Sequence, residues 1–156
     1  MSVKIQFCLD HDSNTSDYAL MEPEKACVND VGYDLTAHAY EKYPGVAGDK
    51  LFIVDTCVKV IPPFIGYFLL FSRSSLPKKG FSIANSVGVI DPDYRGNLKT
   101  ILRFHGKGSG EKEIKELLGS RIVQIALFPR VSIDSEVIET VDETERGEGG
   151  FGSTGA

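Results

Sequence analysis

Residues Leu51 to Phe71 read LFIVDTCVKVIPPFIGYFLLF, and this stretch decides the fold class. Its β-branched and aromatic residues form two runs, Leu51–Ile61 and Gly66–Phe71, with Pro62 and Pro63 between them. Such runs are typical of strands, and the proline pair predicts the turn that joins them. Two neighbouring strands, rather than a helix, are therefore expected here.

The same pattern extends over most of the chain. Val3–Leu9 alternates apolar and polar residues, which predicts a strand with one apolar face. Further strands are expected at Phe81–Ile90, Asn97–Phe104, Arg121–Phe128 and Val131–Ile138. Glu111–Leu118 has helix-forming composition, but it is short enough to form either one or two helical turns or a polar loop. Many short strands separated by turn residues predict an all-β sandwich or barrel.

Composition narrows the class of protein. The 156 residues fit one domain with one hydrophobic core, and the formal net charge of −5 disfavours a nucleic-acid binder while leaving a small anionic substrate open. The sequence has no apolar run of membrane-spanning length, and its N-terminus does not resemble a signal peptide. Three cysteines at irregular spacing (Cys8, Cys27 and Cys57) predict reduced, packed thiols. We therefore expect a soluble, unsecreted protein of the cytoplasm or nucleus, with no membrane partner.

The C-terminal residues 142–156 differ from the rest. They read DETERGEGGFGSTGA, with five glycines and one large apolar residue, and cannot bury enough apolar area to fold alone. The expected division is a β-barrel domain at 1–141 and a flexible arm at 142–156. The arm is either a frayed terminus or a lid that orders over a ligand. Its GxGxxG spacing does not predict a dinucleotide site, because no strand and helix flank it.

Five separated segments resemble the ordered motifs of the trimeric dUTP diphosphatases. They are GYDL at Gly32–Leu35, RSSLPKKG at Arg73–Gly80, GVIDPDYRGN at Gly88–Asn97, GSRIVQ at Gly119–Gln124 and RGEGGFGSTG at Arg146–Gly155. The chain departs from the family at Val31, Ser120 and Val123, where Ala, Asp and Ala are usual. The resemblance implies a distorted jelly-roll, or β-clip, barrel with a flexible C-terminal arm, assembled as a homotrimer.

The resemblance also implies an activity: magnesium-dependent hydrolysis of dUTP to dUMP and pyrophosphate, which keeps uracil out of DNA and supplies dUMP for dTMP synthesis. Asp91 would orient and activate the water that attacks the α-phosphate. Taken alone, Asp91 is an ordinary turn residue. Its apolar neighbours Val89 and Ile90 predict a partly desolvated carboxylate, which favours proton acceptance.

The resemblance also implies that the hairpin expected around Asp91 recognises the base and the sugar. Backbone groups at Gly88, Val89 and Ile90 and near Lys99 would pair with uracil, with help from Asn85. Tyr94 would lie under the sugar and exclude a 2′-hydroxyl, although a tyrosine at a strand edge is also ordinary packing.

Phosphate and metal contacts are implied for the other motifs. Arg73, Ser74 and Ser75 would bind phosphoryl oxygens, although RSSLPKKG is by composition also a solvated turn. Gln124 would lie near the α-phosphate, and Asp34 would contact Mg²⁺ through water. The arm residues implied in substrate binding are Arg146, Phe151, Gly152, Ser153 and Thr154, with Phe151 stacked on uracil.

Two alternatives remain open from the sequence. One is a dCTP deaminase or a bifunctional relative, which shares the fold and an Arg-Ser-Ser motif. The other is a catalytically silent binding module that retains the fold. For the dUTP diphosphatase itself, the resemblance implies active sites shared between the three subunits.

Overall fold

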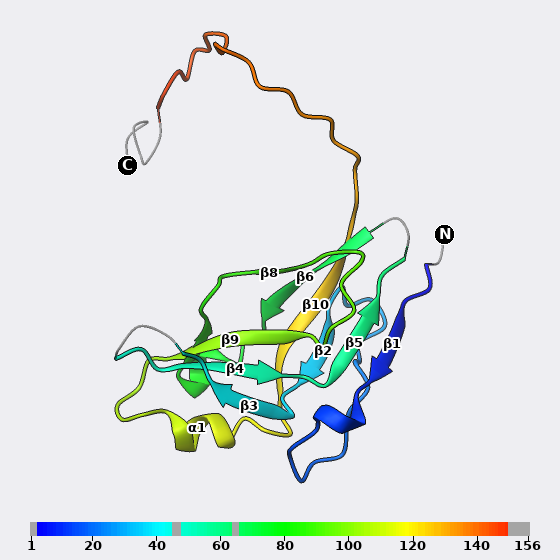
Figure 1. The fold of residues 1–156 in the computed structure, drawn as a ribbon, viewed down its shortest axis with the longest axis vertical. Helices are drawn as coiled ribbons and strands as arrows, with labels where there is room; N and C mark the ends of the chain where they lie inside the picture. The colour runs from blue at the N-terminus through cyan, green and yellow to red at the C-terminus, as the bar shows by residue number, and fades with distance from the viewer. Residues whose placement is uncertain (1–2, 45–47, 64–65, 150–156) are drawn as a thin grey trace.

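The computed structural model describes residues 3–44, 48–63 and 66–149, and their strands form three antiparallel sheets (Figure 1). The small sheet pairs β1 (Gln6–Leu9) with β5 (Val58–Ile61). The second sheet has the order β2 (Tyr33–Thr36), β10 (Arg121–Pro129), β6 (Gly66–Ser72) and β8 (Gly88–Ile90). The third has the order β3 (Ala39–Lys42), β4 (Leu51–Asp55), β9 (Lys99–Phe104) and β7 (Phe81–Ile83). The all-β prediction is confirmed.

The core lies between the two larger sheets, and along β6 and β9 buried residues alternate with more exposed ones. In β6 every second residue is buried, so Phe68 and Leu70 point inward while Tyr67, Leu69 and Phe71 are partly exposed. Other fully buried side chains come from separate strands and include Phe52, Phe81, Leu102 and Ile125. This core fixes the ends of β6 and β8, where the predicted site residues lie.

Two predicted strands are interrupted. Leu51–Ile61 breaks into β4 and β5 at Cys57, whose φ of 53° is in the left-handed region. Phe81–Ile90 breaks into β7 and β8 around Ser86, which has a φ of 65°. Strands flank both bends, as the β-branched and aromatic residues predict, but neither bend contains a glycine.

The predicted strand Val131–Ile138 is wrong. Beyond β10 the chain leaves the body as an extended segment (Figure 1), and Val131, Ile133 and Val137 are largely exposed. A strand needs a neighbour to satisfy its backbone groups, and no backbone hydrogen bond from 131–138 to another part of the described chain is present. The alternating pattern of this segment therefore finds no partner within one chain.

The cysteines are confirmed as unpaired, but only one is packed. Cys57 is buried, whereas Cys8 and Cys27 are exposed. Burial raises the pKa of Cys57 to about 12, so its thiol is a neutral packing group.

The possible helix is present in shortened form. α1 covers Glu111–Lys115 and buries Ile114 against the core. Among the described residues, no helix is long and apolar enough to cross a membrane.

His38, between β2 and β3, predicts acid sensitivity. Its ring is fully buried, neither ring nitrogen has a hydrogen-bond partner among the described residues, and burial lowers its pKa against the opposing effect of Asp55. As the pH falls, His38 therefore takes up a proton in the unfolded chain, near pH 6.5, before it does so in the folded protein. The contribution of neutral His38 to the free energy of unfolding is thus complete above that pH and is lost as the pH falls below it. We expect the free energy of unfolding to fall between pH 7 and 5 by at most about 1.4 kcal/mol per pH unit on account of His38.

Urea unfolding at several pH values measures this effect. His38→Leu should flatten the pH dependence, while His11→Gln, at an exposed histidine, should retain it. Equal slopes in wild type and His38→Leu would show that His38 is not the responsible group.

Candidate active site

The first of two pockets that are lined by predicted site residues lies where β2, β6 and β10 meet. It has a volume of about 310 Å³ and is mostly polar. Its lining residues are Ala26, Asp30, Val31, Gly32, Asp34, Arg73, Ser74 and Gln124. Strand register explains the grouping, because Gln124 in β10 pairs with Asp34 in β2 on one side and with Phe71 in β6 on the other. Arg73 follows the end of β6 by one residue, and so reaches the same place.

An ion pair organises this pocket. The Arg73 Nε lies 2.9 Å from Oδ1 of Asp34, which is buried. The second carboxylate oxygen of Asp34 faces Arg121, whose Nη1 is 3.6 Å away and also lies 2.7 Å from Glu24 Oε1. Asp34 is thus held between two guanidinium groups. A structural role for Arg121 is compatible with the sequence, but its pairing with Glu24 could not be predicted, because the two residues are nearly a hundred positions apart and no local pattern links them.

The side chain of Gln124 contacts the backbone of two neighbouring segments, at Ser72 and Gly32. Its Nε2 donates to the carbonyl oxygen of Ser72 at 3.3 Å, and its Oε1 lies against Gly32, where a Cβ would collide with it. A side chain at position 32 would therefore force the end of Gln124 to shift from its present place in the pocket.

The second pocket lies beside β8 and has a volume of about 230 Å³. It is lined by Asn85, Gly88, Val89, Ile90, Asp91, Tyr94 and Lys99. Each of these seven residues was a predicted site residue. β8 is an edge strand whose other side pairs with β6, so its outward backbone N–H and C=O groups face this pocket.

Asp91 and Tyr94 are both exposed in the single chain. The partial desolvation expected for Asp91 is therefore absent, because Val89 is itself 61% exposed and does not cover the carboxylate. Tyr94 is fixed through its hydroxyl, which donates to the Asn97 carbonyl oxygen at 2.9 Å.

One chain does not bring the two pockets together. Ile90 pairs with Phe68 near the start of β6, whereas Arg73 lies five residues further along that strand direction. At about 3.3 Å per residue, Phe68 and Arg73 are separated by roughly 17 Å along the strand. Asp91 and Arg73 therefore lie toward opposite ends of β6.

Several predicted residues lie in neither pocket. Ser75 is partly buried beside the first pocket but does not line it. Arg146 lies in the exposed arm, where its Nε donates to the carbonyl oxygen of Gly149 at 2.9 Å. Phe151, Gly152, Ser153 and Thr154 lie outside the described residues.

These features define an all-β protein with two candidate site pockets: one carries paired arginines and carboxylates, and the other lies beside an edge strand. The model of the dUTPase family matches residues 20–155. The chain belongs to the dUTPase family, whose members hydrolyse dUTP.

Individual relatives agree with this assignment. The chain is 42% identical over 135 residues to the deoxyuridine 5′-triphosphate nucleotidohydrolase of Candida albicans, covering 85% of this chain and 80% of that protein. It is 41% identical over 136 residues to the enzyme of the same name from Mus musculus, covering 85% and 77%.

Solved structures share the fold. A dUTPase of Staphylococcus bacteriophage 80alpha with dUpNHpp superposes with a TM-score of 0.73 at 24% identity, covering 98% of this chain and 99% of that one. The dUTPase of Streptococcus mutans gives 0.62 at 28% identity, covering 83% and 98%. The jelly-roll-like architecture expected from the motifs is thereby confirmed.

Proposed function

We propose that this chain hydrolyses dUTP to dUMP and pyrophosphate by attack of a water molecule on the α-phosphate, with Asp91 as the group that orients and deprotonates the water. The observation that carries the proposal is the pocket beside β8, because its seven lining residues coincide with those implied for base, sugar and water. In a cell, this reaction keeps uracil out of DNA and supplies dUMP for dTMP synthesis.

Uracil is proposed to bind along the outer edge of β8. The backbone of Gly88–Ile90 offers alternating donors and acceptors there, and cytosine would present the reversed pattern at the same edge. Asn85 and the backbone of Lys99 complete this contact, and Tyr94 packs under the sugar. Rejection of cytosine then follows from unpaired backbone groups rather than from a steric block.

The triphosphate is proposed to bind in the polar pocket. The described contacts of Arg73 use Nε toward Asp34 and Nη1 toward the Arg121 carbonyl oxygen, which leaves further guanidinium donors for phosphoryl oxygens. Ser74 and Ser75 add hydroxyl donors, and Gln124 adds an amide near the α-phosphate. The pocket thus positions the substrate and neutralises charge without a covalent intermediate.

The residues of this pocket fit magnesium carried by the substrate. The carboxylates of Asp30 and Asp34 line it, and both oxygens of Asp34 already face arginines. Contact with Asp34 through water suits this arrangement, since Mg²⁺ keeps several waters in such sites. When bound with the triphosphate, magnesium supplies neutralisation of the pyrophosphate leaving group. A dUTPase mutant from phage phi11 of S. aureus coordinates a structural Mg(II) ion, which agrees with use of this metal in related folds.

A homotrimer with shared sites is proposed from the separation of the two pockets. Asp91 lies far from the polar pocket of its own chain, but in an oligomer it would lie beside the polar pocket of a neighbouring chain. An apolar groove of about 410 Å³, lined in part by Tyr67, Leu69 and Val89, adjoins Asp91 and offers a surface for that neighbour. Coverage of the groove would supply the desolvation that Asp91 lacks in one chain.

The exposed apolar residues after β10 fit the same assembly. Val131, Ile133 and Val137 would be buried against another subunit, and the arm at 142–156 would continue over its site. Arg146, Ser153 and Thr154 would bind the distal phosphates, and Phe151 would stack on uracil, with Gly152 allowing close approach. The body at 1–141 and the arm would then be distinct units. A cytoplasmic or nuclear location is proposed from the unpaired cysteines.

An assay with dUTP, dCTP and UTP tests the proposed function. We expect magnesium-dependent release of pyrophosphate from dUTP, with at least about 10²-fold lower kcat/KM for dCTP and UTP, because each leaves polar groups unpaired or crowds Tyr94. Chelation of magnesium should abolish turnover. Ammonia release from dCTP would instead identify a deaminase, and no turnover of any of the three would indicate a silent binding module.

A further inference from the structure

The bend between β4 and β5 is held in a strained conformation by one buried carboxylate. Cys57 has a φ of 53°, which a non-glycine residue adopts at an energetic cost. Oδ1 of Asp55 accepts a hydrogen bond from the Cys57 backbone N–H at 2.7 Å, and the Asp10 N–H donates to the Cys57 carbonyl oxygen at 2.8 Å. The bend is thus fixed from both sides.

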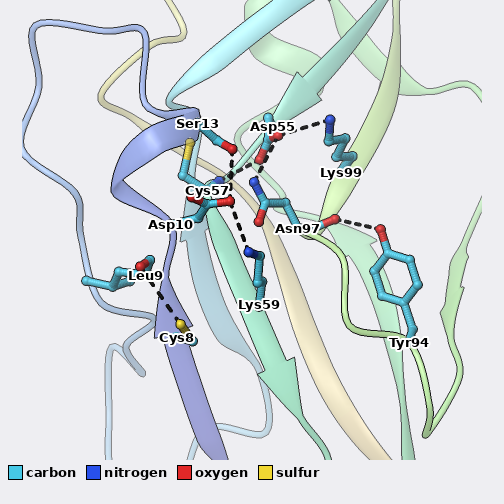
Figure 2. Close-up of polar contacts among 10 residues, drawn as sticks. All are labelled: Cys8, Leu9, Asp10, Ser13, Asp55, Cys57, Lys59, Tyr94, Asn97 and Lys99. Atoms are coloured by element: carbon cyan, nitrogen blue, oxygen red, sulfur yellow. Dashed lines mark hydrogen bonds and ion pairs between the residues drawn. The ribbon is translucent and has the colours of Figure 1, made fainter.

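The second oxygen of the same carboxylate contacts the segment that connects β8 to the start of β9. Oδ2 of Asp55 accepts from Asn97 Nδ2 at 3.2 Å and lies 3.1 Å from Lys99 Nζ. Figure 2 shows the carboxylate between these two side chains. Asp55 and Asn97 are each only 7% exposed, so their bond is shielded from water. The hydrogen bond with Asp55 also raises the pKa of Lys99, which keeps the ammonium group charged.

The bend between β4 and β5 also forms hydrogen bonds with the backbone of the segment before β9. The N–H and Oγ1 of Thr56 both donate to the Leu98 carbonyl oxygen, at 3.1 and 2.8 Å. The Leu98 N–H donates to the Val58 carbonyl oxygen at 2.7 Å. Movement of the bend would therefore move the start of β9.

This network ends at the wall of the pocket beside β8. The Tyr94 hydroxyl is bonded to the Asn97 carbonyl oxygen, and its ring lies against Gly96, where a Cβ would collide with the hydroxyl (Figure 2 shows the Asn97 contact). The position of the half-exposed Tyr94 ring thus depends on Asn97, and that of Asn97 depends on Asp55. Tyr94 and Lys99 both line the pocket.

We propose that Asp55 is a positioning residue for substrate selection: through Asn97 and Lys99 it fixes the Tyr94 wall and thereby sets the preference for deoxyribose over ribose. This inference rests on the proposed function, in which Tyr94 packs under the sugar. Asp55 itself lies behind that wall and outside the pocket, so it acts through the other residues and has no contact with the reacting atoms.

Asp55→Asn separates the two duties of the carboxylate. An asparagine keeps the size and can still accept from the Cys57 N–H, but its NH₂ then faces the Lys99 ammonium, which can only donate. Its contact with Asn97 survives only if the Asn97 amide turns over, so that the Asn97 Oδ1, which has no partner among the described residues, accepts from the new NH₂. The bend should survive, while the ion pair with Lys99 is lost and Asn97 leaves its present orientation. Turning over the amide of the new asparagine would restore the contacts with Asn97 and Lys99. It would also place the NH₂ of that amide against the Cys57 backbone N–H, so that two donors face each other.

Steady-state kinetics with dUTP and UTP provide the test. We expect Asp55→Asn to raise KM for dUTP about tenfold and to lower the ratio of kcat/KM for dUTP over UTP about tenfold, with kcat for dUTP changed less than about threefold. The matched control is Asp49→Asn, which removes the exposed Asp49–Arg103 pair on the same sheet and should alter none of these values beyond about twofold.

A second variant keeps the test decisive if Asp55→Asn does not fold. Tyr94→Phe removes the hydroxyl bonded to Asn97 but keeps the ring, so it should lower the same ratio, and Asp55→Asn should add little to it in the double variant. An unchanged dUTP to UTP ratio in folded Asp55→Asn, or in Tyr94→Phe, would overturn the positioning role. Failure of the wild-type protein to hydrolyse dUTP would instead refute the proposed function.

Discussion

Replacing Asp91 with asparagine is expected to lower kcat for dUTP by roughly 10²- to 10⁴-fold, the usual contribution of a positioned general base. The amide keeps the shape of the side chain at the pocket beside β8 but cannot accept the proton of the attacking water. Substrate binding should change within about threefold, because base, sugar and phosphate contacts do not involve this carboxylate. Single-turnover kinetics with dUTP and titration with a nonhydrolysable analogue measure the two effects separately.

Asp93→Asn is the matched control. Asp93 lies two residues away in the same exposed turn and lines neither pocket, so the same loss of charge should leave kcat unchanged. Near-normal turnover by Asp91→Asn would remove Asp91 from the proposed mechanism. An equal loss in both variants would assign the effect to the turn as a whole.

The body of the fold could be predicted because its signals are local. Runs of β-branched and other large apolar residues in Gly66–Phe71 and Arg121–Phe128 indicate strands, and both are present at nearly the predicted bounds. The bends at Cys57 and Ser86 could not be predicted in the same way. The left-handed backbone at Cys57 is held by the carboxylate of Asp55 and by the distant Asp10, whose backbone N–H bonds to the Cys57 carbonyl oxygen.

The two candidate pockets differ in the same way: one is formed by a single segment of the sequence, and the other by residues that are distant in sequence. The pocket beside β8 is contained in one short segment, Asn85 to Lys99, although β8 and the following β9 pair in different sheets and do not form the hairpin expected there. Motif resemblance therefore identified its complete lining. The polar pocket depends on pairings between β2, β6 and β10, and the resemblance supplied Asp34, Arg73, Ser74 and Gln124 but missed Asp30. Glu24, Arg121 and Asp55 act by holding other side chains. A single sequence contains no pattern that marks such supporting contacts.

The failed strand at Val131–Ile138 is informative for assembly. Its alternating apolar residues have the composition of a strand but lack a neighbour within one chain. A sequence pattern does not distinguish a partner strand in the same chain from one in another subunit. The error in the predicted fold and the separation of roughly 17 Å along β6 between Phe68, which pairs with Ile90, and Arg73 both favour a site completed by neighbouring chains.

Complementation between two inactive variants should measure that sharing directly. One variant is Asp91→Asn with a complete arm, and the other retains Asp91 but ends at Glu145. The second should fold, since its core strands precede the cut, but should turn over dUTP poorly without Arg146 and the residues that follow. Each variant alone supplies no site with both a carboxylate at position 91 and an arm.

Co-refolding equal amounts is expected to restore about a quarter of wild-type activity, because in a cyclic trimer a site takes Asp91 from one subunit and the arm from another. Random assembly gives each element a probability of about one half, and the product is about one quarter. Mixing the two variants after each has folded should restore much less, which controls for free exchange of arms. If each site used Asp91 and the arm of the same chain, co-refolding would restore nothing, and the shared-site proposal would fail while the dUTPase family assignment would stand.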